Sequence, residues 1–263
     1  MSILAAAMAF QLGAGDPWPE NVKFYQPYLT NQILLHQFAN CLSTKAFLKM
    51  SGLSFQEEVR TNAEQMSPSG EVPFLQIGKL VISEFEPIVS HIQARGFNLC
   101  QHLAEDEQAD MKAYLAMVQN KVVNAELYFS WYDDTTWNQV TRKRVASPFP
   151  WPVSYVLPLQ RRRRECQRLK SLGLTSKSPQ EIVESIKVCL QALTEKLGDQ
   201  NYFFGDRPTE LDCLVFGHIY TLVTTTLPSK ELTEALQGFP KLIKFAQMID
   251  KKFMQDHQLE RET

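Results

Sequence analysis

Hydrophobic and polar residues recur in two different ways along the chain. Up to about residue 97 the apolar runs are short and are bounded by turn residues, as in Val22–Gln26, Phe55–Arg60, Pro73–Ile77 and Leu80–Ile82. Runs of this length, with alternating polarity, are typical of β-strands. Gln32–His36 is an alternative first strand, and the pattern does not choose between it and Val22–Gln26.

Two helix signals interrupt these strands. Asn40 can cap a helix over roughly Cys41–Met50. Ser83 and Glu86 have the spacing of a capping box, so Ser83 is predicted to start the next helix. This order of strands and helices predicts a thioredoxin-like domain over residues 18–97, with residues 1–17 forming a flexible tail.

From Glu105 onward the period changes to three and four residues, which is the period of an amphipathic helix. One long helix is predicted to extend from Met111 to Tyr132. The segment Pro148–Pro152 must break any helix, and we expect it to run extended. A helix with a strongly basic stretch follows over Val153–Leu172.

Capping signals mark the remaining helices. Ser178 opens a predicted helix that runs to Leu197, and Thr209 with Asp212 opens an apolar helix over Leu211–Leu222. A last amphipathic helix is predicted over Phe239–Phe253. The fold class is therefore α+β: a thioredoxin-like N-terminal domain, then an all-helical C-terminal domain over residues 103–255 and a flexible tail over 256–263.

Composition narrows the function. The 263 residues carry a net charge of −2, which excludes a generally basic nucleic-acid binder. The five cysteines are widely spaced and contain no CxxC pair, so we expect neither a disulfide framework nor a zinc site. The apolar N-terminus lacks the basic residues of a signal or transit peptide, and no transmembrane segment is predicted. Membrane association is expected to be peripheral.

The stretch around Val72-Pro73 resembles a thioredoxin-type glutathione site. A Val-Pro bond before a strand is a common place for a cis peptide, and we expect Val72 and Pro73 to have a structural role. Glutathione transferases characteristically follow the acid at the next helix start with a Ser that holds a carboxylate. Here Phe85 takes that place, and Glu86 adds a negative charge, so both changes oppose glutathione binding.

A rival hypothesis is a divergent glutathione transferase or thiol enzyme that uses Cys41 or Tyr25. Cys41 is predicted near a helix N-terminus, where the helix dipole favours a thiolate. We nevertheless interpret Cys41 as a small buried apolar side chain. We therefore predict no catalytic, cofactor-binding or metal-binding residue. Val72, Pro73, Ser83, Thr209 and Asp212 are assigned structural roles.

The strongest charge feature is the run Arg161, Arg162, Arg163 and Arg164. Four consecutive arginines occupy every side of a helix, so some must face solvent or a partner. We treat the run as a candidate interaction patch for a protein or an anionic membrane. A third hypothesis is a scaffold that recruits RNA or a phosphoinositide through these arginines, whose binding would depend strongly on salt.

Several segments resemble the metaxin family, and among its branches the metaxin-2 type: WPENVKFYQ (18–26), NAEQMSPSGEVPF (62–74), MKAYLAMV (111–118), SPFPWPVSYVL (147–157) and YFFGDRPTELDCLVFGHIYTL (202–222). The resemblance runs from about Trp18 to Phe253. It implies a glutathione-transferase-like fold without transferase activity.

The resemblance also implies a place and partners for the chain. It implies a peripheral protein on the cytosolic face of the mitochondrial outer membrane, within the sorting and assembly machinery that inserts β-barrel precursors. The implied partners are a membrane-anchored metaxin-1-like protein, the β-barrel core subunit and the precursors, with a link to an intermembrane-space bridging complex. The C-terminal KKFMQDHQLERET contains no anchor, as expected for the metaxin-2 type. No nucleic-acid partner is expected.

Overall fold

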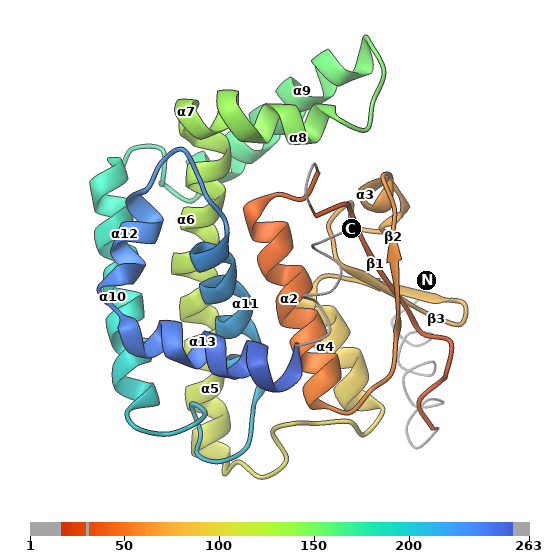
Figure 1. Ribbon diagram of the computed structural model, residues 1–263, viewed down its shortest axis with the longest axis vertical. Coiled ribbons are helices and arrows are strands. Elements are labelled where there is room, and N and C mark those ends of the chain that lie inside the picture. The colour runs from red at the N-terminus through yellow and green to blue at the C-terminus, as the bar shows by residue number, and fades with distance from the viewer. Residues whose placement is uncertain (1–16, 30–31, 255–263) are drawn as a thin grey trace.

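A computed structural model describes residues 17–29 and 32–254 (Figure 1). The tails predicted at 1–17 and 256–263 lie outside the described residues, apart from Pro17. The first half contains a small sheet with helices packed on it. Its elements are β1 (Lys23–Gln26), α2 (Leu35–Met50), β2 (Gln56–Val59), α3 (Ala63–Met66), β3 (Phe74–Ile77), β4 (Leu80–Ser83) and α4 (Phe85–Ala94).

The four strands form one mixed sheet in the order β2-β1-β3-β4. Strand β1 pairs in parallel with β2 and antiparallel with β3, and β4 pairs antiparallel with β3. Lys23–Gln26 is thus the first strand. The alternative at Gln32–His36 is wrong, because Gln32 donates a backbone hydrogen bond to Tyr28 and helix α2 begins at Leu35.

Helix α2 starts earlier than predicted. Asn40 lies inside the helix rather than at its cap, and the start is closed by the backbone N–H of Leu34, which donates to the Gln37 side chain at 3.1 Å. The sequence pattern does not indicate this start, because the cap position holds the apolar Leu34 and lacks the usual hydroxyl or carboxamide side chain. The helix ends at Met50, and Gly52 then takes a φ of 68°.

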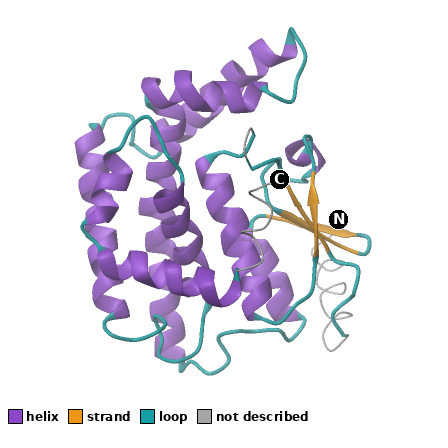
Figure 2. Ribbon diagram, viewed as in Figure 1, coloured by secondary structure: helices purple, strands orange, loops and turns teal. Residues whose placement is uncertain are grey.

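The second half is helical (Figure 2). The helix predicted from Met111 to Tyr132 is continuous from Glu105 to Tyr132, with two π-helical segments inside it. The elements are α5 (Glu105–Val118), η1 (Gln119–Val123), α6 (Asn124–Leu127), η2 (Tyr128–Tyr132), α7 (Asp134–Thr136), η3 (Trp137–Thr141), α8 (Arg142–Ala146), α9 (Val153–Ser171), α10 (Pro179–Leu197), α11 (Glu210–Thr224), α12 (Glu231–Gln237) and α13 (Pro240–Phe253).

The proline-rich segment between α8 and α9 breaks the helix, as predicted, but it does not run extended. It turns at Ser147-Pro148 and again at Trp151-Pro152, where the peptide bond is cis. The backbone carbonyl of Pro150 accepts a hydrogen bond from Ser154, so the loop leads directly into α9.

Both halves share one hydrophobic core, which includes Phe47 and Leu75 from the first half and Phe216 and Ile249 from the second. The apolar helix α11 is buried along most of its length and packs against α2 (Figure 1). Gly217 of α11 lies close to the backbone of α2 at Ala39 and Ser43. Among the described helices, none has the length and apolar character needed to cross a bilayer.

Candidate functional site

The start of α4 differs from the sequence prediction. Ser83 is the last residue of β4 and is buried, so it does not cap the helix, and the predicted capping box is wrong. Glu84 takes the cap position with a φ of 72°, a conformation in which non-glycine residues are uncommon. The spacing of Ser83 and Glu86 suits a cap, but the strand ladder holds Ser83 opposite Phe74.

Phe85 turns into the protein at this helix start. It is 5% exposed, and its ring meets the ring of Phe47 edge-on, with 6.4 Å between centroids. Glu84 and Glu86 instead are exposed. The Val72-Pro73 bond that precedes β3 is cis, and the Pro73 carbonyl accepts a hydrogen bond from the Glu84 backbone N–H at 3.0 Å. The turn and the helix start therefore hold each other in place.

A cavity of about 340 Å³ lies beside this helix start, between the sheet half and the helical half. Its lining comes from α2, α4, η1, α6, α9 and α11 and from the loop before β3. Four carboxylates line it, from Glu71, Glu84, Glu86 and Glu165, and Arg168 and His36 are the basic side chains in the lining. Clefts of this size between domains are common ligand sites.

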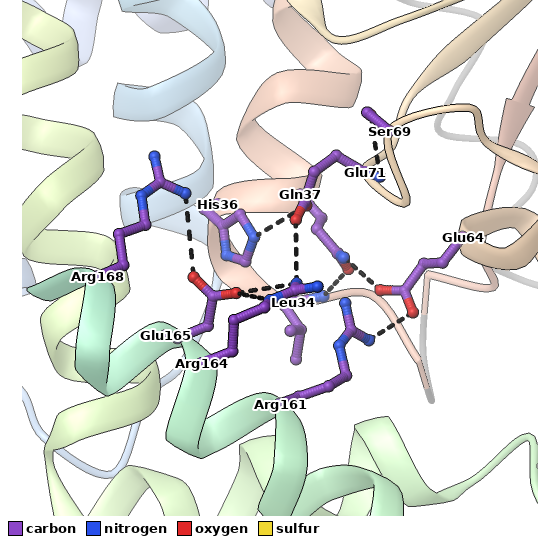
Figure 3. Close-up of polar contacts among 10 residues, drawn as sticks. All are labelled: Leu34, His36, Gln37, Glu64, Ser69, Glu71, Arg161, Arg164, Glu165 and Arg168. Atoms are coloured by element: carbon purple, nitrogen blue, oxygen red, sulfur yellow. Dashed lines mark hydrogen bonds and ion pairs between the residues drawn. The ribbon is translucent and has the colours of Figure 1, made fainter.

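One side of the cavity is built from ion pairs that join the two halves (Figure 3). The Glu71 carboxylate lies 3.8 Å from His36 Nε2 and 3.6 Å from the guanidinium of Arg164. Burial opposes ionisation of Glu71, but the interaction with His36 and the charges of Arg161 and Arg164 outweigh it, so the pKa of Glu71 is lowered. Glu71 is thus ionised at neutral pH.

Contacts within the chain divide the arginine run that was predicted as a four-residue patch. Arg161 bonds to Glu64 of α3 at 2.5 Å, with both side chains mostly buried. Arg162 pairs with Asp134 at 2.6 Å and donates to the Trp131 carbonyl. Arg161 thus joins α9 to the sheet half, whereas Arg162 is paired within the helical half. Arg163 and Arg164 are exposed.

The candidate nucleophiles Cys41 and Tyr25 do not line the cavity, and neither does Tyr28, the other tyrosine before α2. Cys41 lies inside α2, and burial raises its pKa to about 12, so the thiol is neutral at physiological pH. Tyr25 is buried in β1, stacks on Phe74 and donates its hydroxyl hydrogen bond to Gln76 at 3.1 Å. Tyr28 is half exposed in the following loop.

Thr209 and Asp212 stabilise the start of α11. The Asp212 carboxylate accepts from the Thr209 backbone N–H at 2.8 Å, from the Thr209 hydroxyl at 2.7 Å and from the Phe203 backbone N–H at 2.9 Å. Burial nevertheless dominates, and it raises the pKa of Asp212 to about 6. Thr209 and Asp212 therefore anchor the loop before α11, and neither residue lines the cavity.

Sequence reasoning missed a fully buried polar pair in the helical half. Glu126 and His218 meet at 2.8 Å through Oε1 and Nδ1. A carboxylate on α6 and an imidazole on α11 are 92 positions apart, so no local spacing could have joined them. Among the described residues, no group of three or more His, Cys, Asp or Glu side chains is placed to hold a metal ion.

Solved structures share this fold. The chain superposes on the glutathione transferase GSTFuA3 from Phanerochaete chrysosporium with a TM-score of 0.58 and 16% identity, covering 88% of this chain and 96% of that one. It superposes on a glutathione transferase family member from Pseudomonas fluorescens with a TM-score of 0.54 and 16% identity, over 93% and 94% of the two chains. The predicted glutathione-transferase-like fold is confirmed.

Comparisons with family models and with related sequences point to the same family. A model of an outer mitochondrial membrane transport complex protein, Tom37, matches residues 41–162, and one of the glutathione S-transferase C-terminal domain matches residues 186–249. The human protein Metaxin-2 is 42% identical over 97% of both chains. The Caenorhabditis elegans Metaxin-2 homolog is 38% identical over 82% of this chain and 94% of its own length.

Mouse Metaxin-1 is less similar, with 31% identity over 76% of this chain and 65% of its own length. These matches give the chain a role in a transport complex of the mitochondrial outer membrane. The chain belongs to the metaxin family, within its metaxin-2 branch.

Proposed function

We propose that this chain is a non-enzymatic subunit of the mitochondrial outer-membrane sorting and assembly machinery, where it aids import and insertion of β-barrel proteins. It acts through protein–protein contacts with a membrane-anchored metaxin-1-like partner, with the β-barrel core subunit and with β-barrel precursors. It is held peripherally on the cytosolic face. The proposal that the chain is not an enzyme is supported by the start of α4. There the buried ring of Phe85 and the exposed carboxylates of Glu84 and Glu86 stand where a glutathione transferase has an anion-binding group.

The helix start opposes an anionic tripeptide. The N-terminal amides of a helix attract anions, but Glu84 and Glu86 already place negative charge there. Repulsion between a ligand carboxylate and one of these groups amounts to about 1–4 kcal/mol at short range near a protein surface. Phe85 offers no hydroxyl, and its ring is fixed in the core against Phe47. A millimolar affinity corresponds to only about 4 kcal/mol.

The cavity also has no activated nucleophile among its lining residues. A transferase lowers the pKa of a thiol with a nearby donor or helix dipole. Cys41 instead has a pKa raised to about 12 by burial, and the Tyr25 ring stacks on the ring of Phe74 in the neighbouring strand. The scaffold is therefore suited to binding a protein rather than to conjugating a thiol.

The sheet provides a route for precursor binding. Strands β2 and β4 are the outer strands of the described sheet, and each pairs on one side only. An extended peptide can add to such an edge through main-chain hydrogen bonds. We propose that a β-type sorting segment of a precursor adds to one of these edges or enters the neighbouring cavity.

Crosslinking on intact mitochondria, followed by identification of the crosslinked neighbours, tests the proposal. We expect the anchored metaxin-1-like partner and the β-barrel core subunit to be recovered. Recovery of the chain only as a free monomer would contradict it. In parallel, purified protein is expected to pass through glutathione-agarose and to show no conjugating turnover. Turnover that is lost in Cys41→Ala or Tyr25→Phe would support the enzyme hypothesis instead.

A further inference from the structure

An unusual surface lies on the arm formed by α8, the proline-rich loop and the first turns of α9, residues 142–160. The arm projects beyond the helix bundle at the top of Figure 1, with its loop at the outer end. Five large apolar side chains within nine positions are exposed on it: Trp151, Val153, Tyr155, Val156 and Leu159. Trp151 is 83% exposed, the highest value among the exposed large hydrophobic residues.

The charge around the arm is one-sided. Residues 135–164 contain seven Lys or Arg and no Asp or Glu, which leaves 20 basic and 29 acidic residues in the rest of the chain. Arg144 is held by the Ile33 carbonyl, and Arg161 and Arg162 are paired within the chain. Arg142 lies over the Tyr155 ring at 5.4 Å. Lys143 and Arg163 are exposed and make no ion pair with the described residues.

The backbone of the loop is suited to a medium with little water. Three of the five residues 148–152 are prolines, which have no N–H to satisfy. The Phe149 N–H donates to the Ala146 carbonyl, and the carbonyls of Pro150 and Pro152 accept bonds from the first turn of α9. An unsatisfied backbone group is costly inside a lipid interface, and this loop has few of them to bury.

We propose that the tip of this arm inserts into the headgroup region of an anionic bilayer, with Trp151, Tyr155 and Leu159 entering the interface and Lys143 and Arg163 facing lipid phosphates. Trp and Tyr are enriched at membrane interfaces, and basic side chains add attraction to anionic lipids. The inference rests on the proposed peripheral placement of the chain at the outer membrane. It assigns that attachment to a particular surface.

The experiment is flotation of the full chain with vesicles of phosphatidylcholine, with or without about one quarter phosphatidylinositol. Binding is expected to be stronger on the anionic vesicles and to weaken as salt rises, because exposed charges are screened. The triple variant W151S/Y155S/L159S is expected to bind at least about ten-fold more weakly, since each side chain removes apolar surface from the interface. The charge variant K143E/R163E is expected to lose only the preference for anionic vesicles.

Val188→Ser is the matched control. Val188 is 69% exposed on α10, away from the arm, so its change is expected to leave vesicle binding unaltered. Trp151 gives an independent readout: Trp131 and Trp137 are buried, and only Trp151 carries a largely exposed indole. Vesicles are expected to shift the tryptophan fluorescence emission of the wild type to shorter wavelength. Lipids that are brominated on their acyl chains are expected to quench this fluorescence. Both effects are expected to be lost in Trp151→Phe.

Three results would overturn the inference: no binding to either vesicle, wild-type vesicle binding by the triple variant, or an unshifted emission. Normal vesicle binding by the triple variant together with loss of the metaxin-1-like partner would identify the arm as a protein-docking surface. Equal thermal unfolding of all variants shows that the fold is intact. Because vesicles contain no protein partner, this assay can fail while the crosslinking test of the proposed function succeeds, and the reverse also holds.

Discussion

Gly217→Ala is expected to loosen the junction between the two halves of the molecule. A Cβ built on Gly217 would lie 2.7 Å from the backbone nitrogen of Ser43, and closer still to the Ala39 carbonyl oxygen and the Ser43 hydroxyl. Two of these three atoms belong to the backbone of α2, so a side-chain rotation cannot relieve the overlap. The variant must therefore move α2 and α11 apart.

The size of the effect follows from two opposing contributions. Inserting a methyl group into a packed core costs about 1–3 kcal/mol, and rigid backbone neighbours place this site at or beyond the upper end. Replacing Gly with Ala inside a helix returns about 1 kcal/mol through helix propensity. The net loss of unfolding free energy is therefore about 2 kcal/mol, which for a chain of this size lowers the Tm by about 4–8 °C.

Thermal unfolding followed by circular dichroism measures this loss. Gly238→Ala is the matched control, because its Cβ would meet only the Ala235 carbonyl oxygen at an ordinary 3.5 Å. Adding Ser43→Ala to Gly217→Ala removes one of the three overlaps and is expected to restore less than half of the loss. A Tm for Gly217→Ala equal to or above that of the wild type would refute the inferred close approach of α2 and α11.

Three further predictions concern single side chains. Arg161→Ala is expected to cost about 1–3 kcal/mol in urea unfolding, because it removes the positive charge beside the mostly buried Glu64 carboxylate, which keeps its hydrogen bond from Gln37. Arg163→Ala in the same run is expected to be neutral, and equal effects of the two changes would contradict the division of the run. Asp212 has a folded pKa of about 6, above its ordinary value of 3.8, so protonation favours the folded state and this group adds stability as the pH falls from about 6 to about 4. Asp212→Asn is expected to flatten that part of the stability profile, and an unchanged slope would contradict the assignment. At pH 7.5 a thiol reagent is expected to label only the half-buried Cys166 in the native protein, and to do so slowly, because burial raises the pKa of this thiol. The other four cysteines are buried and are expected to react only after denaturation. Rapid labelling of a second thiol in the native protein would contradict their burial.

The cavity beside α4 shows how far sequence reasoning reaches for the site. The replacement of an anion-binding Ser by Phe85, and the added charge of Glu86, are visible as residue types at known spacing. The neighbours that complete the cavity come from α6, α9 and α11, more than thirty positions away in the chain. No local pattern places Glu165 or Arg168 beside His36, because only the packing of the two halves brings them together.

The same division holds for the other elements. The start of α10 was predictable, because Ser178 and Glu181 cap each other through bonds that span only three residues. The start of α4 was not, because strand pairing with Phe74 holds Ser83 in the sheet and so overrides a matching cap spacing.

Hydrophobic periodicity and capping residues by themselves determined the order and type of most elements and the change from a mixed half to a helical half. Those signals are local, because hydrogen bonds and side-chain faces within a helix or strand repeat over a few residues. The resemblance to the metaxins came instead from five sequence segments, such as NAEQMSPSGEVPF (62–74). Tertiary structure alone decided which arginines pair within the chain, that Glu126 and His218 meet in the core, and that the apolar side chains around Trp151 gather on a projecting arm. These properties depend on burial, and burial is set by segments that are distant in sequence and adjacent in space.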